Sequence, residues 1–213
     1  QDNERSQLYP RRLPKDTRVK IKGNDLVDDF TITLKAGEAL YTNDLAVIQI
    51  IKDNYGKRPI YFAVTVADIP GFKQNLRNEG MVDRLVSTRG NDQFDIKRLS
   101  ANVDSVYSYR TVFDDSAYKD PNMLRLLNNY GAAYMRASSY YRGEGDFDKA
   151  INYLENSLPF IQERHRFYRT LSQLYLLSGE QYLSSMEYSA PDSTDALINE
   201  AFIRLENAVY YNR

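Results

Sequence analysis

A spacing of 34 residues, which recurs in the C-terminal half, constrains the fold of this chain more than any other feature. In each copy an aromatic residue opens a helix, a small serine lets helices approach, and a glycine marks the turn before a second helix. The spacing therefore predicts two helical hairpins, the second over about residues 165–189. The pairs that show it are Tyr134 and Tyr168, Ser138 and Ser172, Tyr141 and Tyr175, Gly145 and Gly179, and Ala150 and Ser184.

A 34-residue period is that of tetratricopeptide repeats, which these hairpins resemble. The resemblance implies that the first helix of each pair lines a concave groove. Arg166 and Arg169 would there suit an acidic peptide or a C-terminal carboxylate, whereas the alternative is a plain solvent-facing surface. The candidate partner-binding residues of this groove are Met135, Ser139, Arg142, Arg166, Arg169 and Gln173.

The first half has the alternation and turn signals of a small α/β unit. Apolar and polar side chains alternate over residues 19–22 and 30–34, and Gly23, Asn24 and Asp25 supply turn chemistry between them. These segments predict a β-hairpin. A helix is predicted over about residues 44–55, with Asn43 as its N-terminal cap and Gly56 beyond its end.

The pattern of the next segment predicts a buried strand followed by a crossover connection. Residues 60–66 are apolar on both faces, which predicts a central strand. A short helix over residues 72–79 and a strand over 81–86 follow, and this order predicts a right-handed parallel connection. A ligand would then bind beyond the strand, near Asp68 and Gly71, although the glycine-rich phosphate fingerprint is missing.

The predicted fold class is α+β followed by all-α: a small sheet unit and then tetratricopeptide-like antiparallel hairpins. The predicted organisation is an extended lead-in over residues 1–17, a small α/β domain over 18–100 and a helical domain over 101–213. Within the last, helices are predicted over about 102–113 and, capped by Asp120, over 121–142. A terminal helix over about 195–211 is either the first helix of a third repeat or a cap.

Composition excludes several classes of function. The formal net charge is −1, and neither half carries the basic excess that nucleic-acid binding needs. The chain has no cysteine and a single histidine, so we expect no zinc site, no histidine-based triad and no cofactor. The 18 tyrosines suit either core packing or stacking on sugars.

Three blocks of the first half resemble a known family. They are Asn43-Asp44-Leu45-Ala46, the run from Asn54 to Ala63 that contains Arg58-Pro59-Ile60-Tyr61-Phe62, and the run Gly80-Met81-Val82-Asp83-Arg84-Leu85-Val86. They are similar to the C-terminal soluble region of a bacterial multi-pass membrane-protein family of unknown function, whose N-terminal part is similar to protein O-mannosyltransferases. The resemblance implies that a membrane-embedded glycosyltransferase module would precede Gln1.

The function expected from this resemblance is docking rather than catalysis. It implies a non-catalytic periplasmic domain, tethered to the bacterial cell envelope through an absent membrane region, that recruits an acceptor or another protein partner. The alternative is a self-contained peptide-binding adaptor of the tetratricopeptide type. If the sheet unit binds a sugar or peptide, its polar groups would be Asn54, Arg58, Asp68 and Arg84. No nucleophile, base and orienting group converge in these motifs, so we expect no enzyme activity in this chain.

Overall fold

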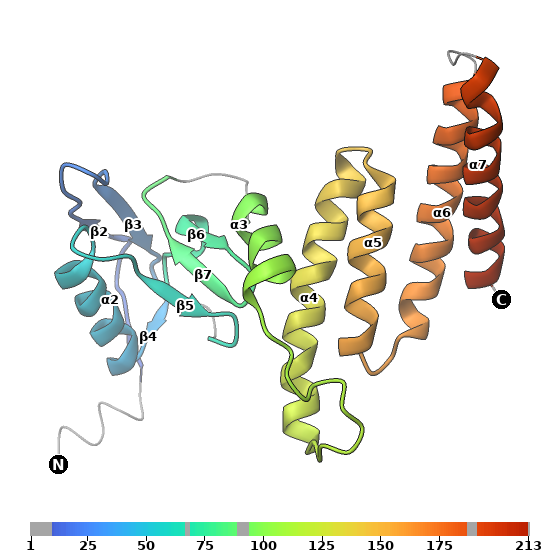
Figure 1. The fold of residues 1–213 in the computed structure, drawn as a ribbon. Coiled ribbons are helices and arrows are strands. Elements are labelled where there is room, and N and C mark those ends of the chain that lie inside the picture. The colour runs from blue at the N-terminus through green and yellow to red at the C-terminus, as the bar shows by residue number, and fades with distance from the viewer. Residues whose placement is uncertain (1–9, 67–68, 89–93, 187–190, 213) are drawn as a thin grey trace. The chain divides into compact units, whose positions relative to one another are not determined.

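The computed structural model describes residues 10–66, 69–88, 94–186 and 191–212, and the chain divides into two compact units, Gln1–Asp95 and Ile96–Arg213. Small antiparallel sheets with one long helix form the first unit, and antiparallel helix pairs dominate the second (Figure 1). The predicted fold class is therefore confirmed. No helix among the described residues is long and apolar enough to cross a bilayer.

The predicted hairpin forms the centre of the first unit. Strands β2 (Thr17–Ile21) and β3 (Phe30–Leu34) pair antiparallel, with Val19 opposite Ile32. A second short ladder joins β1 (Arg11–Arg12) to β4 (Ala39–Leu40), so part of the predicted lead-in is paired.

One helix packs on these strands, close to its predicted position. It is α2 (Thr42–Asn54), and it begins one residue before the expected cap Asn43. The carboxylate of Asp44 accepts a hydrogen bond of 2.8 Å from the N–H of Tyr41 and so satisfies a donor that the helix leaves free. Apolar side chains of the helix join the core of this unit, which includes Ile21, Ile32, Ile48, Ile51, Phe72 and Leu85.

The third sheet corrects the prediction of a parallel crossover. Its order is β5 (Tyr61–Ala63), β7 (Val82–Leu85), β6 (Leu76–Asn78), and both pairings are antiparallel. The apolar run at 60–66 contributes a short edge strand, and β7 is central. The predicted helix over 72–79 is a single 3-10 turn, Lys73–Asn75, followed directly by β6. A parallel connection needs a crossover helix, which this short turn cannot supply.

The side chain of Asn75 explains why a strand, β6, directly follows the 3-10 turn. It is fully buried, and its amide nitrogen donates to the carbonyls of Val86 and Ser87, each at 3.1 Å. These bonds hold the start of β6 against the end of β7. The hydrophobic pattern does not reveal such a contact, because it depends on a polar side chain.

The second unit begins with a short helical segment. Helix α3 (Ile96–Ala101) runs into the π-helix η2 (Asn102–Val106), so the helix predicted over 102–113 ends at Val106. Tyrosines after this point pack on the next helix: the ring of Tyr109 lies 5.4 Å from that of Tyr130.

Long antiparallel helices follow this segment (Figure 1). They are α4 (Pro121–Gly143), α5 (Phe147–Ser157), α6 (His165–Met186) and α7 (Pro191–Tyr211), with the short 3-10 turn η3 (Leu158–Phe160) after α5. As predicted, Asp120 caps α4: its carboxylate accepts from the N–H groups of Asn122 and Met123 at 2.7 and 2.9 Å. Helices α4 and α5 form one pair, and α6 and α7 form the other.

The second pair differs from the prediction. Gly179, expected at the turn, lies inside α6, and Ser184 belongs to the same helix. The partner helix is α7, which was expected to begin a third repeat or to act as a cap. The first turn works because Gly145 has a φ of 78° and Asp146 caps α5, where its carboxylate accepts from Lys149 N–H at 3.1 Å. Glu180 and Gln181 follow Gly179, and neither residue type is a favoured helix cap.

The two pairs nevertheless repeat each other in detail. Ser138 donates to the carbonyl of Ala150, and Ser172 donates to that of Ala208, both at 2.7 Å. The rings of Tyr141 and Tyr153 stack at 5.4 Å and 2°, and those of Tyr175 and Tyr211 stack at 5.8 Å and 10°. Equivalent positions of α4 and α6 are therefore 34 residues apart, and equivalent positions of α5 and α7 are 58 residues apart.

Candidate binding site

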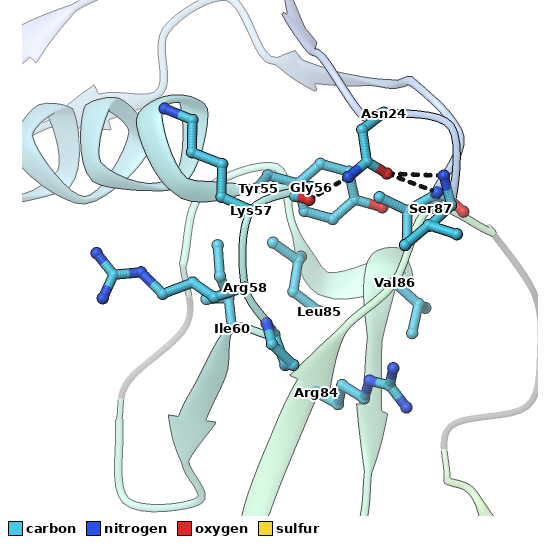
Figure 2. A pocket seen from close by; sticks show the side chains of 13 residues that line it. Asn24, Tyr55, Gly56, Lys57, Arg58, Ile60, Arg84, Leu85, Val86 and Ser87 are labelled. Atoms are coloured by element: carbon cyan, nitrogen blue, oxygen red, sulfur yellow. Dashed lines mark hydrogen bonds between the residues drawn. The ribbon is translucent and has the colours of Figure 1, made fainter.

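A pocket of about 330 Å³ lies in the first unit, where three segments of the chain meet (Figure 2). They are the β2–β3 loop, the end of α2 with the approach to β5, and the end of β7. Apolar side chains and backbone form much of its wall, and none of the thirteen residues described as lining it is acidic. These residues are Asn24, Leu26, Val27, Tyr55, Gly56, Lys57, Arg58, Pro59, Ile60, Arg84, Leu85, Val86 and Ser87.

Asn24 ties two of these segments together. Its side-chain oxygen accepts from the N–H groups of Leu26 and Val27 at 2.8 and 3.0 Å, an Asx-type turn. Its amide nitrogen donates to the carbonyl of Gly56, just beyond α2 (Figure 2). One side chain thus fixes the loop and joins it to the end of the helix.

Tyr55 forms the inner side of the pocket. Its side chain is buried, and its ring meets that of Phe30 edge to face at 5.1 Å. Burial raises the pKa of its hydroxyl, so this group stays protonated well beyond neutral pH. The hydroxyl also donates to the carbonyl of Asp28 at a long 3.5 Å.

Two arginines stand at opposite sides of the pocket. The guanidinium of Arg58 donates from Nε to the side-chain oxygen of Asn54 at 3.0 Å, and its second contact with the same oxygen is shorter. Arg84 lies 3.7 Å from the carboxylate of Glu79, which is almost fully buried. Figure 2 shows the guanidinium groups extending away from each other, so they do not converge on one anion.

The predicted polar set therefore forms only part of a site. Arg58 and Arg84 line the pocket, and Asn54 positions Arg58 while its own amide donates to the carbonyl of Ile50 at 2.7 Å. Asp68 lies outside the described residues. The result is a pocket with an apolar wall and cationic edges rather than a polar cluster.

The residues predicted for the helical groove are spread over α4 and α6. Met135 and Arg166 line one cavity of about 340 Å³, next to Ile161 and Phe167. Arg166 pairs with Glu163 at 2.6 Å, which reduces its availability to a ligand. Ser139, Arg142, Arg169 and Gln173 are exposed and do not line that cavity.

Sequence reasoning missed Asn24, Tyr55 and Ser87 as pocket residues. Asn24 was recognised only as a turn residue, and Tyr55 only as the end of a helix. One signal was available, because two of the three family-like blocks contribute to this pocket: Arg58, Pro59 and Ile60 come from one, and Arg84, Leu85 and Val86 from the other.

The chemistry available in the pocket is set by the groups that line it. Among the described residues, no three histidine or acidic side chains gather closely enough to hold a metal ion. The groups that the pocket offers are guanidinium and ammonium cations, two hydroxyls, an amide and apolar surface. Such groups bind and orient a ligand.

Comparison with known proteins places this pocket in a recognised segment. No curated protein and no solved structure matches the chain. One family model does match, and it concerns a membrane-protein family related to O-mannosyltransferases. Residues 12–105, which include every residue lining the pocket, match the model of this family described as TMEM260-associated domain 2.

Proposed function

We propose that this chain is a non-catalytic docking region of a membrane glycosyltransferase-like protein, and that it recruits an acceptor or a neighbouring protein at the periplasmic face of the cell envelope. The observation that carries the proposal is the pocket between β2–β3, α2 and β7, which lies within the family-matched segment. The family relation supplies the link to a membrane glycosyltransferase, and the pocket supplies a place for a partner.

The pocket suits a peptide segment with an apolar anchor and acidic neighbours. Its volume of about 330 Å³ accommodates one large side chain, and Val27, Ile60 and Leu85 offer apolar contact. Burying a leucine or phenylalanine there is worth about 1.5–3 kcal/mol. Lys57 and Arg58 at the edge would attract carboxylates on either side of the anchor, mainly by steering the encounter.

Site-specific photocrosslinking in the full-length parent protein tests the proposal. A photoreactive phenylalanine analogue replaces Leu26, which lines the pocket and is 89% exposed. We expect one defined protein adduct from cells at this position. The same analogue at Ile50, which is 59% exposed on α2 and does not line the pocket, serves as the position control.

Charge reversal then tests whether formation of the adduct depends on the pocket. The double variant Lys57→Glu and Arg58→Glu should abolish the adduct at position 26, because acidic flanks would be repelled. Lys52→Glu, an exposed reversal on α2 outside the pocket, should leave it intact. An adduct that survives the double variant, or that forms equally at position 50, contradicts pocket docking.

A second candidate is a self-contained adaptor that binds a peptide between α4 and α6. The cavity beside Met135 and Arg166 favours it, since both residues belong to the predicted groove. An adaptor of this kind would lose its peptide in an Arg166→Glu variant, since Arg166 lines this cavity, and would keep it after the Lys57 and Arg58 changes. The opposite pattern supports the pocket.

A further inference from the structure

One edge of the three-stranded sheet in the first unit has no strand beside it. Strand β5 pairs with β7 on one side, and among the residues that the structure describes no strand pairs with its other side. The side chains of Tyr61 and Ala63 on this strand are both exposed, Tyr61 by 44%. A free strand edge is a template on which another extended chain can pair.

The hydrogen bonds between β5 and β7 identify the backbone groups that face outward. The carbonyl of Ile60 accepts a hydrogen bond of 3.0 Å from β7, and the N–H of Val64 donates one of 3.2 Å to the residue before β7. In an antiparallel ladder, alternate residues bond to opposite sides. The N–H groups of Tyr61 and Ala63 and the carbonyl of Tyr61 therefore point toward the free edge.

The free edge is limited at both ends. The carbonyl of Ala63 accepts from the N–H of Val66 at 2.9 Å, so the chain turns after Ala63. Pro59, the preceding position of the same alternation as Tyr61, has no N–H to donate. An added strand would therefore pair with residues 61–63, and its chain would leave the edge beside Pro59.

The edge adjoins the pocket described above. Arg58, Pro59 and Ile60 line the pocket and lead directly into β5. A chain that leaves the edge beside Pro59 is consequently next to the apolar wall of the pocket. Figure 2 shows Arg58 extending away from Arg84 of β7, which places its guanidinium on the side of the free edge.

The chemistry of the edge and of the pocket selects the occupant. Outward N–H and C=O groups on a strand fit an extended main chain, whereas a helix pairs its backbone groups internally. Lys57 and Arg58 favour a carboxylate on that chain. If two β5 strands paired antiparallel, a second copy would bring Val64–Val66 toward Arg58, and these residues carry no carboxylate.

We propose that the partner peptide adds to the sheet as a strand antiparallel to β5 and then enters the pocket with its apolar anchor. This inference rests on the proposed docking function and specifies the conformation and direction of the partner. Both other pairings of this sheet are antiparallel, the arrangement that is more stable per residue. Antiparallel pairing with Ala63 and then Tyr61 directs the peptide toward Pro59, so its anchor lies C-terminal to its paired residues.

Crosslinking in the full-length parent protein tests the direction of the peptide. A photoreactive phenylalanine analogue at Leu26 or at Tyr61 captures the partner from cells, and mass spectrometry locates the crosslinked residue. Both positions should capture one segment of one protein, and the residue reached from position 26 should lie a few residues C-terminal to that reached from position 61. The reverse order, two separate segments, or capture of a second copy of this chain overturns the proposal.

A proline on the free edge tests the backbone contact. Ala63→Pro removes an N–H that points away from β7 and leaves the bonds of Ile60 and Val64, so circular dichroism should be unchanged. The variant should lower the yield of the adduct at position 26 about tenfold, because it loses one hydrogen bond and its ring obstructs the added strand. Ala63→Val keeps the N–H and should leave the yield unchanged.

The outcomes separate this inference from the proposed function. An adduct at position 26 that survives Ala63→Pro at full yield overturns the added strand and leaves docking in the pocket intact. A wild-type protein that forms no adduct at position 26 contradicts the docking function itself.

Discussion

At the residue scale, acidic side chains link the helices of the second unit by accepting hydrogen bonds from tyrosines. Glu155 of α5 accepts from the hydroxyls of Tyr175 and Tyr211 at 2.7 and 3.1 Å, and Asp104 accepts from Tyr153 at 2.6 Å. Burial, followed by the neighbouring carboxylate, raises the pKa of Tyr153 and Tyr211 to about 12. These tyrosines are therefore structural donors, which favours packing over sugar stacking for them.

The carboxylate of Asp148 should make the stability of the helical unit depend on pH in the acidic range. Burial opposes its ionisation, but the hydroxyls of Ser178 and Tyr182 and the charge of Arg204 outweigh burial and lower its pKa below 3.8. A lowered folded-state pKa gives stability that is complete above the unfolded value and is lost as pH falls through the folded value. Asp148→Asn should lower the free energy of unfolding near neutral pH.

Urea unfolding followed by circular dichroism at several pH values measures this effect. The wild-type chain should lose more stability than Asp148→Asn as the pH falls below 3.8. Asp115→Asn removes an exposed carboxylate and should behave like the wild type. Parallel pH dependence in Asp148→Asn and wild type would show that this carboxylate does not stabilise the fold.

Asn24 should stabilise the pocket more than its exposed position suggests. Its alanine variant loses bonds to Leu26, Val27 and Gly56. We expect a loss of about 1–2 kcal/mol in the free energy of unfolding, measured by urea titration. Asn43→Ala, at an exposed position in the first turn of α2, is the matched control. Equal losses of unfolding free energy in the two variants would contradict the stabilising role of the Asn24 hydrogen bonds.

At the scale of elements, the sequence predicted helix boundaries best where a proline or glycine stands next to a helix cap. Pro121 and Asp120 marked the start of α4, and the glycine and cap at Gly145 and Asp146 marked the first turn. Gly179 matched Gly145 in spacing but lacked a following cap, so α6 continues through it. A Cβ at Gly179 would lie 3.1 Å from Leu205, which indicates that this glycine serves close packing of α7.

Substitution by alanine should change the stability of the chain in opposite directions at two glycines near the α4–α5 turn. Gly143 is helical with open space around its Cβ position, so Gly143→Ala should stabilise the chain by about 0.5–1 kcal/mol. Gly145 has a φ of 78°, so Gly145→Ala should destabilise it by about 1 kcal/mol. Thermal melts followed by circular dichroism compare them, and a shift of the same sign in both would contradict the assigned turn.

At the scale of the whole molecule, the sequence indicated a sheet unit and a helical unit but not the contacts within the sheet. Strand direction was wrong because the helix predicted over residues 72–79 is only a 3-10 turn, so the chain has no crossover that could make these strands parallel. The pocket was missed in part because it joins segments near residues 24, 56 and 85, and only the fold brings them together. Arg58 and Arg84 were found because their blocks resembled a family.

The central claim is that this chain recruits a partner and leaves catalysis to the parent protein. It is tested most directly by sugar-transfer kinetics of the full-length parent, with the protein crosslinked through position 26 as acceptor. The Lys57→Glu and Arg58→Glu variant should raise KM for the acceptor about tenfold, the effect of losing about 1.4 kcal/mol of binding, and leave kcat unchanged. A variant with normal KM and reduced kcat would contradict the account, because the pocket would then act in the chemical step.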